Sequence, residues 1–343
     1  MESFMRKEIV LITGANGEIG HGLINHLGKQ GGQSIVTIDV QQLDEELEPF
    51  SLNAIQGDIL DIDLLERLVA EYDIKTIFHL ASILSTKAEY NPEVAHKVNV
   101  DGTLNLLKIA ADQSRCQERQ VKFIYPSSIA VYGLPDLKTK EIAGKVKESD
   151  WCNPITMYGC NKLYCENLGH YYAQFYRQLS SETNRYSIDF RSIRFPGLIS
   201  AQTIPTGGTS DYGPEMLHQA AQDKPYSCFV RPDTRLPFMV MPDAIKALLQ
   251  LETASPSELN QFVYNVTSFN PRAEDFYRIV KNAFPKAQIT FEPDKNRQCI
   301  VDTWPSDVDD TAARKDWRWE PGYDQTRAFE EYLVPAVKMF YKG

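Results

Sequence analysis

The N-terminal stretch Glu8–Thr13 (EIVLIT) runs directly into Gly14–Gly20 (GANGEIG), and this junction decides the fold. The apolar run predicts a buried strand, and the apolar spacing that continues to Lys29 predicts a helix. Glycines at this spacing allow a tight turn, a close backbone approach to a ligand, and close packing of helix on strand. The free N–H groups at the start of such a helix favour an anion. The stretch therefore predicts a strand–turn–helix unit that holds a phosphate-bearing ligand.

The same alternation of short apolar runs and helical stretches continues over residues 1–199. Strands of about five residues that alternate with helices are typical of βαβ units, which build a parallel sheet. The predicted fold class is therefore α/β, a doubly wound parallel sheet of the Rossmann type. Further strands are expected at Ser34–Asp39, Leu52–Gln56, Thr76–Leu80, Val121–Tyr125 and Tyr186–Phe195, with helices at Leu64–Tyr72, Glu93–Ala111 and Met157–Arg177.

The pattern becomes less regular after Phe195. Ser200–Gly213 is rich in Gly, Thr, Ser and Pro, which indicates a long functional loop. Shorter elements follow, so we expect residues 200–343 to form mainly a smaller α/β substrate lobe, with some segments returning to the main sheet. The expected elements are helices at Pro242–Leu251 and Arg272–Ala283 and strands at Phe262–Val266 and Gln288–Phe291.

Composition and charge exclude several classes of protein. The 343 residues are 43% hydrophobic and 24% charged, which is ordinary for a globular chain with a sizeable core. A formal net charge of −10 disfavours nucleic-acid or anionic-membrane binding, since both depend on clustered basic residues. No apolar run approaches the roughly 20 residues of a membrane helix. The six cysteines show no CxxC spacing, so we expect reduced thiols in a cytoplasmic protein without a metal site.

Two acids follow predicted strands and bear on the ligand. Asp39 closes the second strand, 19 positions after Gly20, where a carboxylate can accept hydrogen bonds from both hydroxyls of an adenosine ribose. Because it would repel a 2′-phosphate, we expect NAD as cofactor and not NADP; the other interpretation is an acid that closes a turn. Asp58 follows the third strand, and two interpretations stay open: a contact to the adenine edge, or a cap on the next helix.

Tyr158 and Lys162 stand four positions apart near the start of a predicted helix, so they share one face. Tyrosine, with a pKa of about 10, is a poor base at neutral pH, but a nearby ammonium together with the positive nicotinamide of a bound oxidised cofactor lowers that pKa. A tyrosine and a lysine at this spacing often occur by chance on helix surfaces, so the pair alone does not indicate a catalytic site. Ser128, however, lies at the end of the fifth strand, where parallel sheets bind ligands. Together the three predict proton transfer at a substrate oxygen. His79, inside an apolar strand, is expected to be a packed core residue.

With the glycine stretch, this pattern resembles that of the extended short-chain dehydrogenase/reductases, the NAD-dependent epimerase/dehydratase family. The resemblance implies NAD as cofactor and Ser128, Tyr158 and Lys162 as catalytic residues. It also implies that Asn99 holds a helix open for a proton-relay water; the alternative is an ordinary polar helix residue. The implied cofactor-binding residues are Gly14, Asn16, Gly17, Glu18, Ile19, Gly20, Asp39, Asp58, Ile59, Leu80, Ala81, Ser82, Asn99, Tyr158, Lys162 and Pro196.

Segments along the whole chain are similar to one branch of that family, the short-chain-type L-threonine 3-dehydrogenases. Ser82 departs from the branch, which would have alanine there. The matching segments are His79–Ser85, Arg194–Ser200, Gly207–Tyr212, Asp233–Pro237, Met241–Asp243, Arg297–Gln298, Asp302–Pro305 and Asp309–Arg314.

The branch implies oxidation of the 3-hydroxyl of L-threonine to 2-amino-3-ketobutyrate, with Tyr158 as general base and hydride transfer to NAD. Ser128 is then also a substrate contact. Ser85 and Thr209 are assigned to the carboxylate and Asp211 to the ammonium, and each has a loop-capping alternative. Trp304 is expected either to close over the site or to lie in the core.

Two other function classes stay open. One is an NAD-retaining sugar-nucleotide epimerase resembling UDP-glucose 4-epimerase, which isomerises without net reduction of the cofactor. An acid such as Asp211 is a poor neighbour for a diphosphate and argues against it. The other is a non-catalytic cofactor-sensing module, which has no need of the catalytic residues. The family resemblance also implies a homodimer through a four-helix bundle of Glu93–Ala111 and Met157–Arg177.

Overall fold

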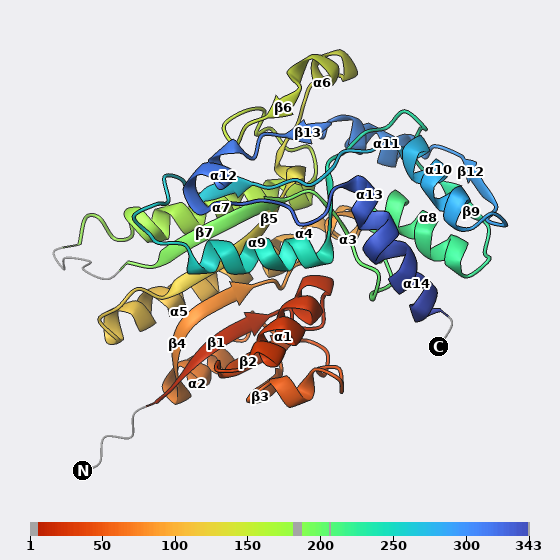
Figure 1. Ribbon diagram of the computed structural model, residues 1–343. Helices are drawn as coiled ribbons and strands as arrows, with labels where there is room; N and C mark the ends of the chain where they lie inside the picture. Colours follow the sequence, from red (N-terminus) through yellow and green to blue (C-terminus); the bar gives the residue numbers. More distant parts are fainter. Residues whose placement is uncertain (1–5, 181–186, 206, 342–343) are drawn as a thin grey trace, which may run out of the picture.

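A seven-stranded parallel sheet forms the centre of the computed structural model, which describes residues 6–180, 187–205 and 207–341 (Figure 1). The strand order is β11-β7-β5-β4-β1-β2-β3, and the order reverses between β1 and β4. That reversal is the topological switch point of a doubly wound sheet, so the predicted fold class is confirmed. The strands are β1 (Lys7–Thr13), β2 (Ile35–Asp39), β3 (Asn53–Gln56), β4 (Tyr72–His79), β5 (Lys122–Ser128), β7 (Asp189–Phe195) and β11 (Val263–Asn265).

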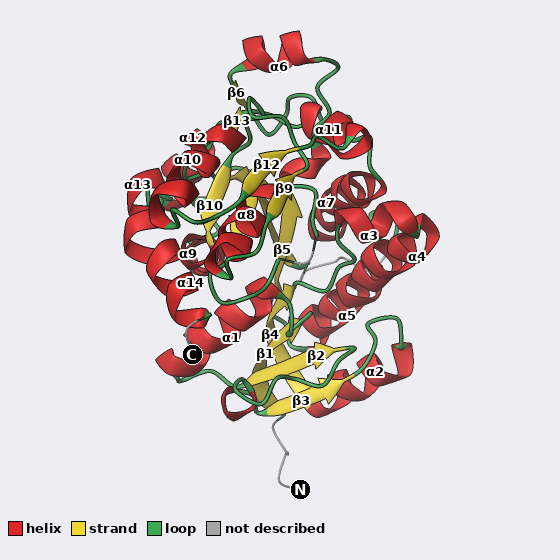
Figure 2. Cartoon of the chain, turned by 90° about the vertical axis from the view of Figure 1, so that its right-hand side faces the viewer, coloured by secondary structure: helices red, strands yellow, loops and turns green. Residues whose placement is uncertain are grey.

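Helices cover both faces of this sheet, as Figure 2 shows with the sheet between two helix layers. Alternate residues of a strand point to opposite faces. Ile9 and Leu11 of β1 therefore pack with α2, α5 and α7, whereas Val10 and Ile12 pack with α1 and α9. These helices are α1 (Glu18–Gln30), α2 (Ile62–Glu71), α5 (Gly102–Cys116), α7 (Met157–Gln174) and α9 (Met241–Thr253).

Local capping explains where two of these helices begin. Thr156 accepts a hydrogen bond from the Gly159 N–H, so α7 begins at Met157 as expected. Asp61 accepts from the Leu64 N–H and caps α2. The interpretation of Asp58 as the cap of this helix is therefore wrong, because Asp58 instead accepts from the Leu60 N–H within its own loop (2.9 Å).

One predicted helix is divided in the structure. The stretch expected as a single helix at Glu93–Ala111 comprises α4 (Pro92–His96), a π-helical turn (Lys97–Asp101) and the first part of α5. The wider turn is centred on Asn99, as the family resemblance implied for an opened helix. Tyr186, the expected first residue of the sixth strand, lies outside the described residues, and that strand begins at Asp189.

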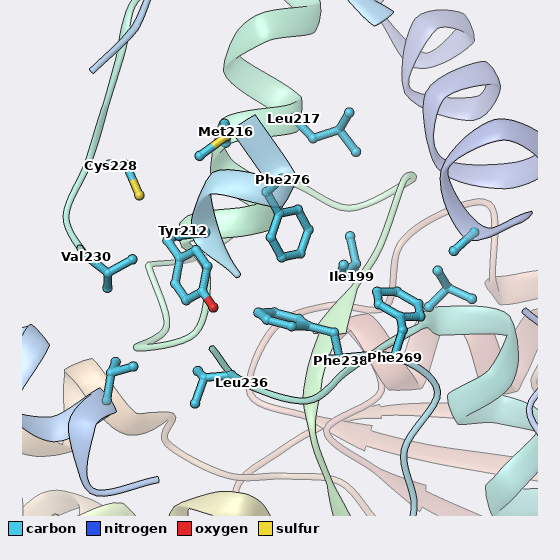
Figure 3. Packing of buried hydrophobic residues seen from close by; sticks show 14 of the residues in the cluster. Ile199, Tyr212, Met216, Leu217, Cys228, Val230, Leu236, Phe238, Phe269 and Phe276 are labelled. Atoms are coloured by element: carbon cyan, nitrogen blue, oxygen red, sulfur yellow. The ribbon is translucent and has the colours of Figure 1, made fainter. Parts of the chain in front are cut away.

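The remaining segments form a third apolar cluster beside the sheet, seen closely in Figure 3. Phe238 and Phe276 meet edge to face, with 5.0 Å between ring centroids, and Tyr212 packs against both. The division of the chain at residue 199 stays a prediction, since segments cross it in both directions: β11 joins the main sheet, and the early β6 pairs with the late β13. The elements here are β6 (Lys145–Val146), β8 (Gly197–Ile199), β9 (Tyr226–Cys228), β10 (Phe238–Val240), β12 (Ile289–Phe291), β13 (Asp307–Val308), α8 (Tyr212–Ala221), α10 (Ala273–Ala283) and α11 (Lys295–Asp302).

Short helices complete the chain. Over the described residues, none of the helices has the length and apolar character needed to cross a membrane. The helices not yet given are α3 (Ser85–Tyr90), α6 (Leu137–Ala143), α12 (Thr311–Trp317), α13 (Gln325–Arg327) and α14 (Val334–Phe340), with a π-helical turn at Ala328–Leu333 and 3₁₀ turns at Glu48–Phe50 and Ile129–Val131.

Candidate active site

A cavity of about 560 Å³ lies along the carboxyl ends of the sheet strands. This is the edge of an open parallel sheet at which ligands bind. Asn16 and Asn99 do not line the cavity, and Trp304 forms part of its wall. Apolar wall residues such as Leu84, Val98 and Leu198 were not predicted, because nothing in their local sequence marks them. The predicted site residues that line it are Gly14, Gly17, Glu18, Ile19, Gly20, Asp39, Asp58, Ile59, Leu80, Ala81, Ser82, Ser85, Ser128, Tyr158, Lys162, Pro196, Thr209 and Asp211.

The glycine loop leaves no room for side chains. Gly14 has a φ of +71°, and a Cβ built on it would lie 2.5 Å from the Ala81 nitrogen. A Cβ on Gly20 would lie 2.3 Å from the Ala15 oxygen. Gly17 stands at the N-cap of α1 without a side-chain acceptor for the N–H groups of the first turn. The loop therefore presents bare backbone N–H groups to the cavity, which is the arrangement that suits a pyrophosphate.

Asp39 is fixed from two sides at the end of β2. One carboxylate oxygen accepts from the Asn16 N–H (3.0 Å), and the other accepts from the Gln41 N–H (3.0 Å). Each oxygen has a second lone pair, so Asp39 can close its turn and still receive a ribose diol. Asn16 acts outside the cavity, since its side-chain amide donates to the Gln42 carbonyl (2.6 Å) and ties the two loops together.

The predicted catalytic residues converge near the end of β5. Lys162 Nζ donates to the Pro126 carbonyl (2.7 Å) and lies 5.5 Å from the Tyr158 ring centroid. Burial lowers the pKa of Lys162 to about 8. Burial also raises the pKa of Tyr158, and a hydrogen bond from the Ser128 hydroxyl opposes that rise. Desolvation outweighs the hydrogen bond from Ser128 here, and the expectation of a depressed Tyr158 pKa, which includes the positive charge of a bound cofactor, stays a prediction.

A buried ion pair lies beneath these residues and was not predicted. Glu166, one helical turn after Lys162, accepts two hydrogen bonds from Arg194 (2.9 and 2.7 Å) and one from the Ser127 hydroxyl (2.5 Å). Arg194 also donates to the Tyr132 hydroxyl (3.0 Å). The network fixes α7, β5 and β7 to one another at the carboxyl end of the sheet. In the sequence, Arg194 alternates with apolar residues in a strand, which indicates a buried charge. This pattern does not reveal that Glu166 is its partner.

Two polar residues behind the cavity support its wall. His79 lies between the hydroxyls of Thr13 and Thr103, each 2.8 Å from a ring nitrogen. Burial, with a smaller effect of the Lys162 charge, lowers its pKa to about 3, and the prediction of a packed core histidine is confirmed. The Asn99 side chain accepts from the Ile83 N–H (2.7 Å) and donates to the Ile83 carbonyl (3.0 Å). Asn99 therefore holds the loop after β4 in place.

At the substrate end of the cavity, the start of α3 contacts the loop before α8. The Thr209 hydroxyl donates to the Ser85 hydroxyl (3.0 Å), although 124 positions separate the two residues. Asp211 accepts from the Gly208 N–H (2.5 Å), and burial raises its pKa. Arg297 donates to the Gly208 carbonyl from the far side of that loop (2.7 Å). The structure therefore shows loop-capping contacts for all three predicted substrate residues and brings them together on one wall.

The amino-acid sequence matches a known family. The model of the NAD dependent epimerase/dehydratase family matches residues 10–267, which is most of the chain. The chain belongs to this family. The glycine loop, Asp39 at the end of β2 and the residues that surround Lys162 agree with this assignment.

Within this family, the chain is similar to several dehydrogenases. The mitochondrial L-threonine 3-dehydrogenase of Bos taurus is 34% identical over 92% of this chain and 79% of its own length. A monomeric L-threonine 3-dehydrogenase from a metagenome, in its apo form, superimposes with a TM-score of 0.84 at 36% identity, over 97% of this chain and all of that one (100%). The holo GalE-like L-threonine dehydrogenase of Cupriavidus necator gives 0.82 at 32% identity, over 96% and 98%. The predicted resemblance to this branch and the prediction of an NAD-dependent oxidoreductase are confirmed.

Proposed function

We propose that the chain oxidises the 3-hydroxyl group of L-threonine to 2-amino-3-ketobutyrate with NAD. The observation that carries this proposal is the convergence of Ser128, Tyr158 and Lys162 on the cavity that also contains the glycine loop. The similarity of the whole chain to L-threonine 3-dehydrogenases supports the choice of substrate. Asp211 supports it as well, because a carboxyl group is a suitable partner for an amino group.

The chain's own residues divide the chemistry between proton transfer and orientation. Ser128 orients the substrate hydroxyl, and Tyr158 receives its proton as C3 becomes a carbonyl carbon. Lys162, held by the Pro126 carbonyl, carries the positive charge that stabilises the ionised form of Tyr158. When bound, NAD supplies the acceptor for the hydride that leaves C3. Because the phenol is neutral in the free protein, we expect oxidation to be faster in mildly alkaline solution than at neutral pH.

The cavity fits NAD in two observable ways. The bare backbone around Gly14 and Gly20 provides room for a pyrophosphate that any Cβ would fill. Asp39 offers an oxygen to each ribose hydroxyl and would repel a 2′-phosphate. These residues would hold the adenosine half of the cofactor, while Tyr158 and Lys162 would hold the nicotinamide ribose. Asp58 and Ile59 line the region in which we place the adenine.

The charge of the cavity favours a small amino acid over a sugar nucleotide. Among the described residues that line it, Lys162 alone has a basic side chain, against the four acids Glu18, Asp39, Asp58 and Asp211. The glycine loop can neutralise one pyrophosphate through its backbone, but a second diphosphate at the substrate end needs cationic partners. The epimerase alternative is therefore the less well supported of the two.

The test is the formation of reduced nicotinamide, followed by absorbance, when the protein is mixed with NAD and L-threonine. D-threonine, allo-threonine, serine and UDP-glucose serve as parallel substrates, and NADP replaces NAD in one arm. We expect a signal with L-threonine and NAD, and little with NADP because of Asp39. Conversion of UDP-glucose to its epimer, with no signal from any amino acid, would contradict the proposal and favour the epimerase.

A homodimer is the second part of this proposal, with the chain functioning in the cytoplasm. Tyr164, Tyr171 and Phe175 are exposed on or at the end of α7, and Val94 is exposed on α4 beside it. These apolar side chains lie where the expected four-helix bundle would place a second copy. Sedimentation should then give about twice the chain mass of 39.0 kDa. A mass of one chain at micromolar concentration would contradict the dimer, and one relative is itself described as monomeric.

A further inference from the structure

Glu18 is an acid in an unusual place for a phosphate-binding loop. It is the first residue of α1, directly after the N-cap Gly17, and its side chain lines the cavity. The N–H groups of this turn are the ones that favour an anion. A carboxylate at the same turn brings a like charge to that anion site. The backbone N–H groups of this turn therefore favour a bound phosphate, whereas an ionised Glu18 disfavours it.

The groups that face Glu18 do not neutralise it. Asp211, from the loop before α8, faces it with a second carboxyl group. Thr203 lies beside it, and a hydrogen bond from the Thr203 hydroxyl favours the ionised form of Glu18, which opposes the effects of burial and of Asp211. Arg297 donates to the Gly208 carbonyl (2.7 Å), and its charge opposes the rise in the pKa of Asp211. On α1 itself, His21 is paired with Asp44 at 2.9 Å.

This environment disfavours the ionised form of Glu18. Burial removes the carboxyl group from water, and the like charge of Asp211 adds to the effect, so the pKa of Glu18 rises to about 7. A neutral acid at this position can donate a hydrogen bond to a phosphate oxygen, whereas an ionised one repels it. Glu18 is therefore compatible with a bound pyrophosphate when its carboxyl group is protonated and incompatible with it when that group is ionised.

We propose that Glu18 binds the dinucleotide as the neutral acid, so that binding takes up one proton from solution whenever Glu18 is ionised in the free protein. This inference rests on the proposed use of NAD. Below the pKa of Glu18 the proton is already present, and affinity does not depend on this group. Above it, the dissociation constant for NAD rises by up to about tenfold per pH unit.

Calorimetry of NAD binding tests this directly. Titrations in phosphate and in Tris, whose ionisation enthalpies differ, report the protons taken up at each pH. When NAD binds at mildly alkaline pH, we expect the wild-type protein to take up most of a proton through Glu18. The Glu18→Gln variant should lack this part of the proton uptake. The variant should also bind NAD more tightly than wild type, by about tenfold one pH unit above the pKa of Glu18. Glu46→Gln, which removes an exposed acid near α1 outside the cavity, is the matched control and should behave as wild type.

Asp211→Asn provides an independent check. Removing its charge should lower the pKa of Glu18, so the pH at which NAD affinity begins to fall should move to a lower value. Equal proton uptake and equal pH dependence in wild type and Glu18→Gln would overturn the inference, as would an equal loss of uptake in Glu46→Gln. Absence of NAD binding in the wild-type protein would instead overturn the proposed function.

Discussion

The dinucleotide end and the substrate end of the cavity are built in different ways. At the dinucleotide end, Gly14 follows β1 and Asp39 closes β2, so a rigid parallel sheet positions both of them. At the substrate end, Ser85 begins α3 and Thr209 lies in the loop before α8, and the two bond to each other across 124 positions of sequence. The first end is fixed by the sheet before any ligand binds. At the second end, the polar groups already bond to one another, so a bound substrate must replace those hydrogen bonds.

The largest expected effect is the loss of Tyr158, at the point where the two ends meet. Tyr158→Phe removes the proton acceptor and leaves the ring in place, so kcat/KM with L-threonine should fall by about a thousandfold. NAD affinity, measured by calorimetry, should fall far less than kcat/KM, because only the Tyr158 contact to the nicotinamide ribose is lost while Lys162, Asp39 and the glycine loop remain. Tyr164→Phe, on an exposed part of the same helix, is the control. Comparable turnover in Tyr158→Phe and wild type would remove this residue from the chemistry.

The second prediction breaks the dinucleotide end itself. Gly14→Ala places a Cβ 2.5 Å from the Ala81 nitrogen at a φ of +71°, so backbone must move. Gly31 has a similar φ of +70° with nothing within 4 Å, and Gly31→Ala therefore isolates the conformational effect. We expect Gly14→Ala to lower the free energy of unfolding by about 1–3 kcal/mol more than Gly31→Ala does. Urea denaturation measures the difference, and equal losses would contradict the close approach.

The third prediction concerns acid stability. The folded-state pKa of His79 is about 3, below the unfolded value of about 6.5, so its contribution is present above the unfolded pKa and is lost as pH falls. Between pH 7 and pH 5 the wild-type protein should lose about 2 kcal/mol of unfolding free energy through this residue. His79→Gln should lack that part of the loss. His218→Gln is the comparison at the substrate lobe, where burial also lowers the histidine pKa. Identical acid profiles for wild type and His79→Gln would refute the assignment.

The smallest expected effect lies at the substrate end. Ser85→Ala removes the hydroxyl that pairs with Thr209 and that we assign to the substrate carboxylate. The KM for L-threonine should rise by about tenfold while NAD affinity stays unchanged, because one hydrogen bond to a charged group contributes about 1.5 kcal/mol or more. Thr86→Val, next to it but bonded to the Gly207 carbonyl, is the neighbouring control. An unchanged KM in Ser85→Ala would show that the serine only joins the two loops.

The same contrast explains what could be predicted from the sequence. Short apolar strands and the residues directly after them are local signals, and a parallel sheet brings their ends to one edge. Gly14, Asp39 and Ser128 could therefore be placed together without the structure. The contact between Ser85 and Thr209 joins two segments that are far apart in the sequence, and no local pattern predicts it.

Two features of the site depend on geometry that the sequence hides. Asp61 and not Asp58 caps α2, and two nearby acids before a helix cannot be told apart without backbone geometry. The direction of the Tyr158 pKa shift depends on burial, which the spacing to Lys162 does not reveal. The partner of Arg194 was equally hidden, because Glu166 approaches it from α7.

The most direct test of the account uses L-threonine that carries deuterium at C3. If the sheet end holds NAD and the loop end holds threonine, the deuterium must move from C3 to the nicotinamide as the ketone forms. We predict one deuterium in the reduced nicotinamide for each 2-amino-3-ketobutyrate produced, detected by mass spectrometry. Ketone formation without deuterium in the nicotinamide, or no ketone at all, would contradict the account.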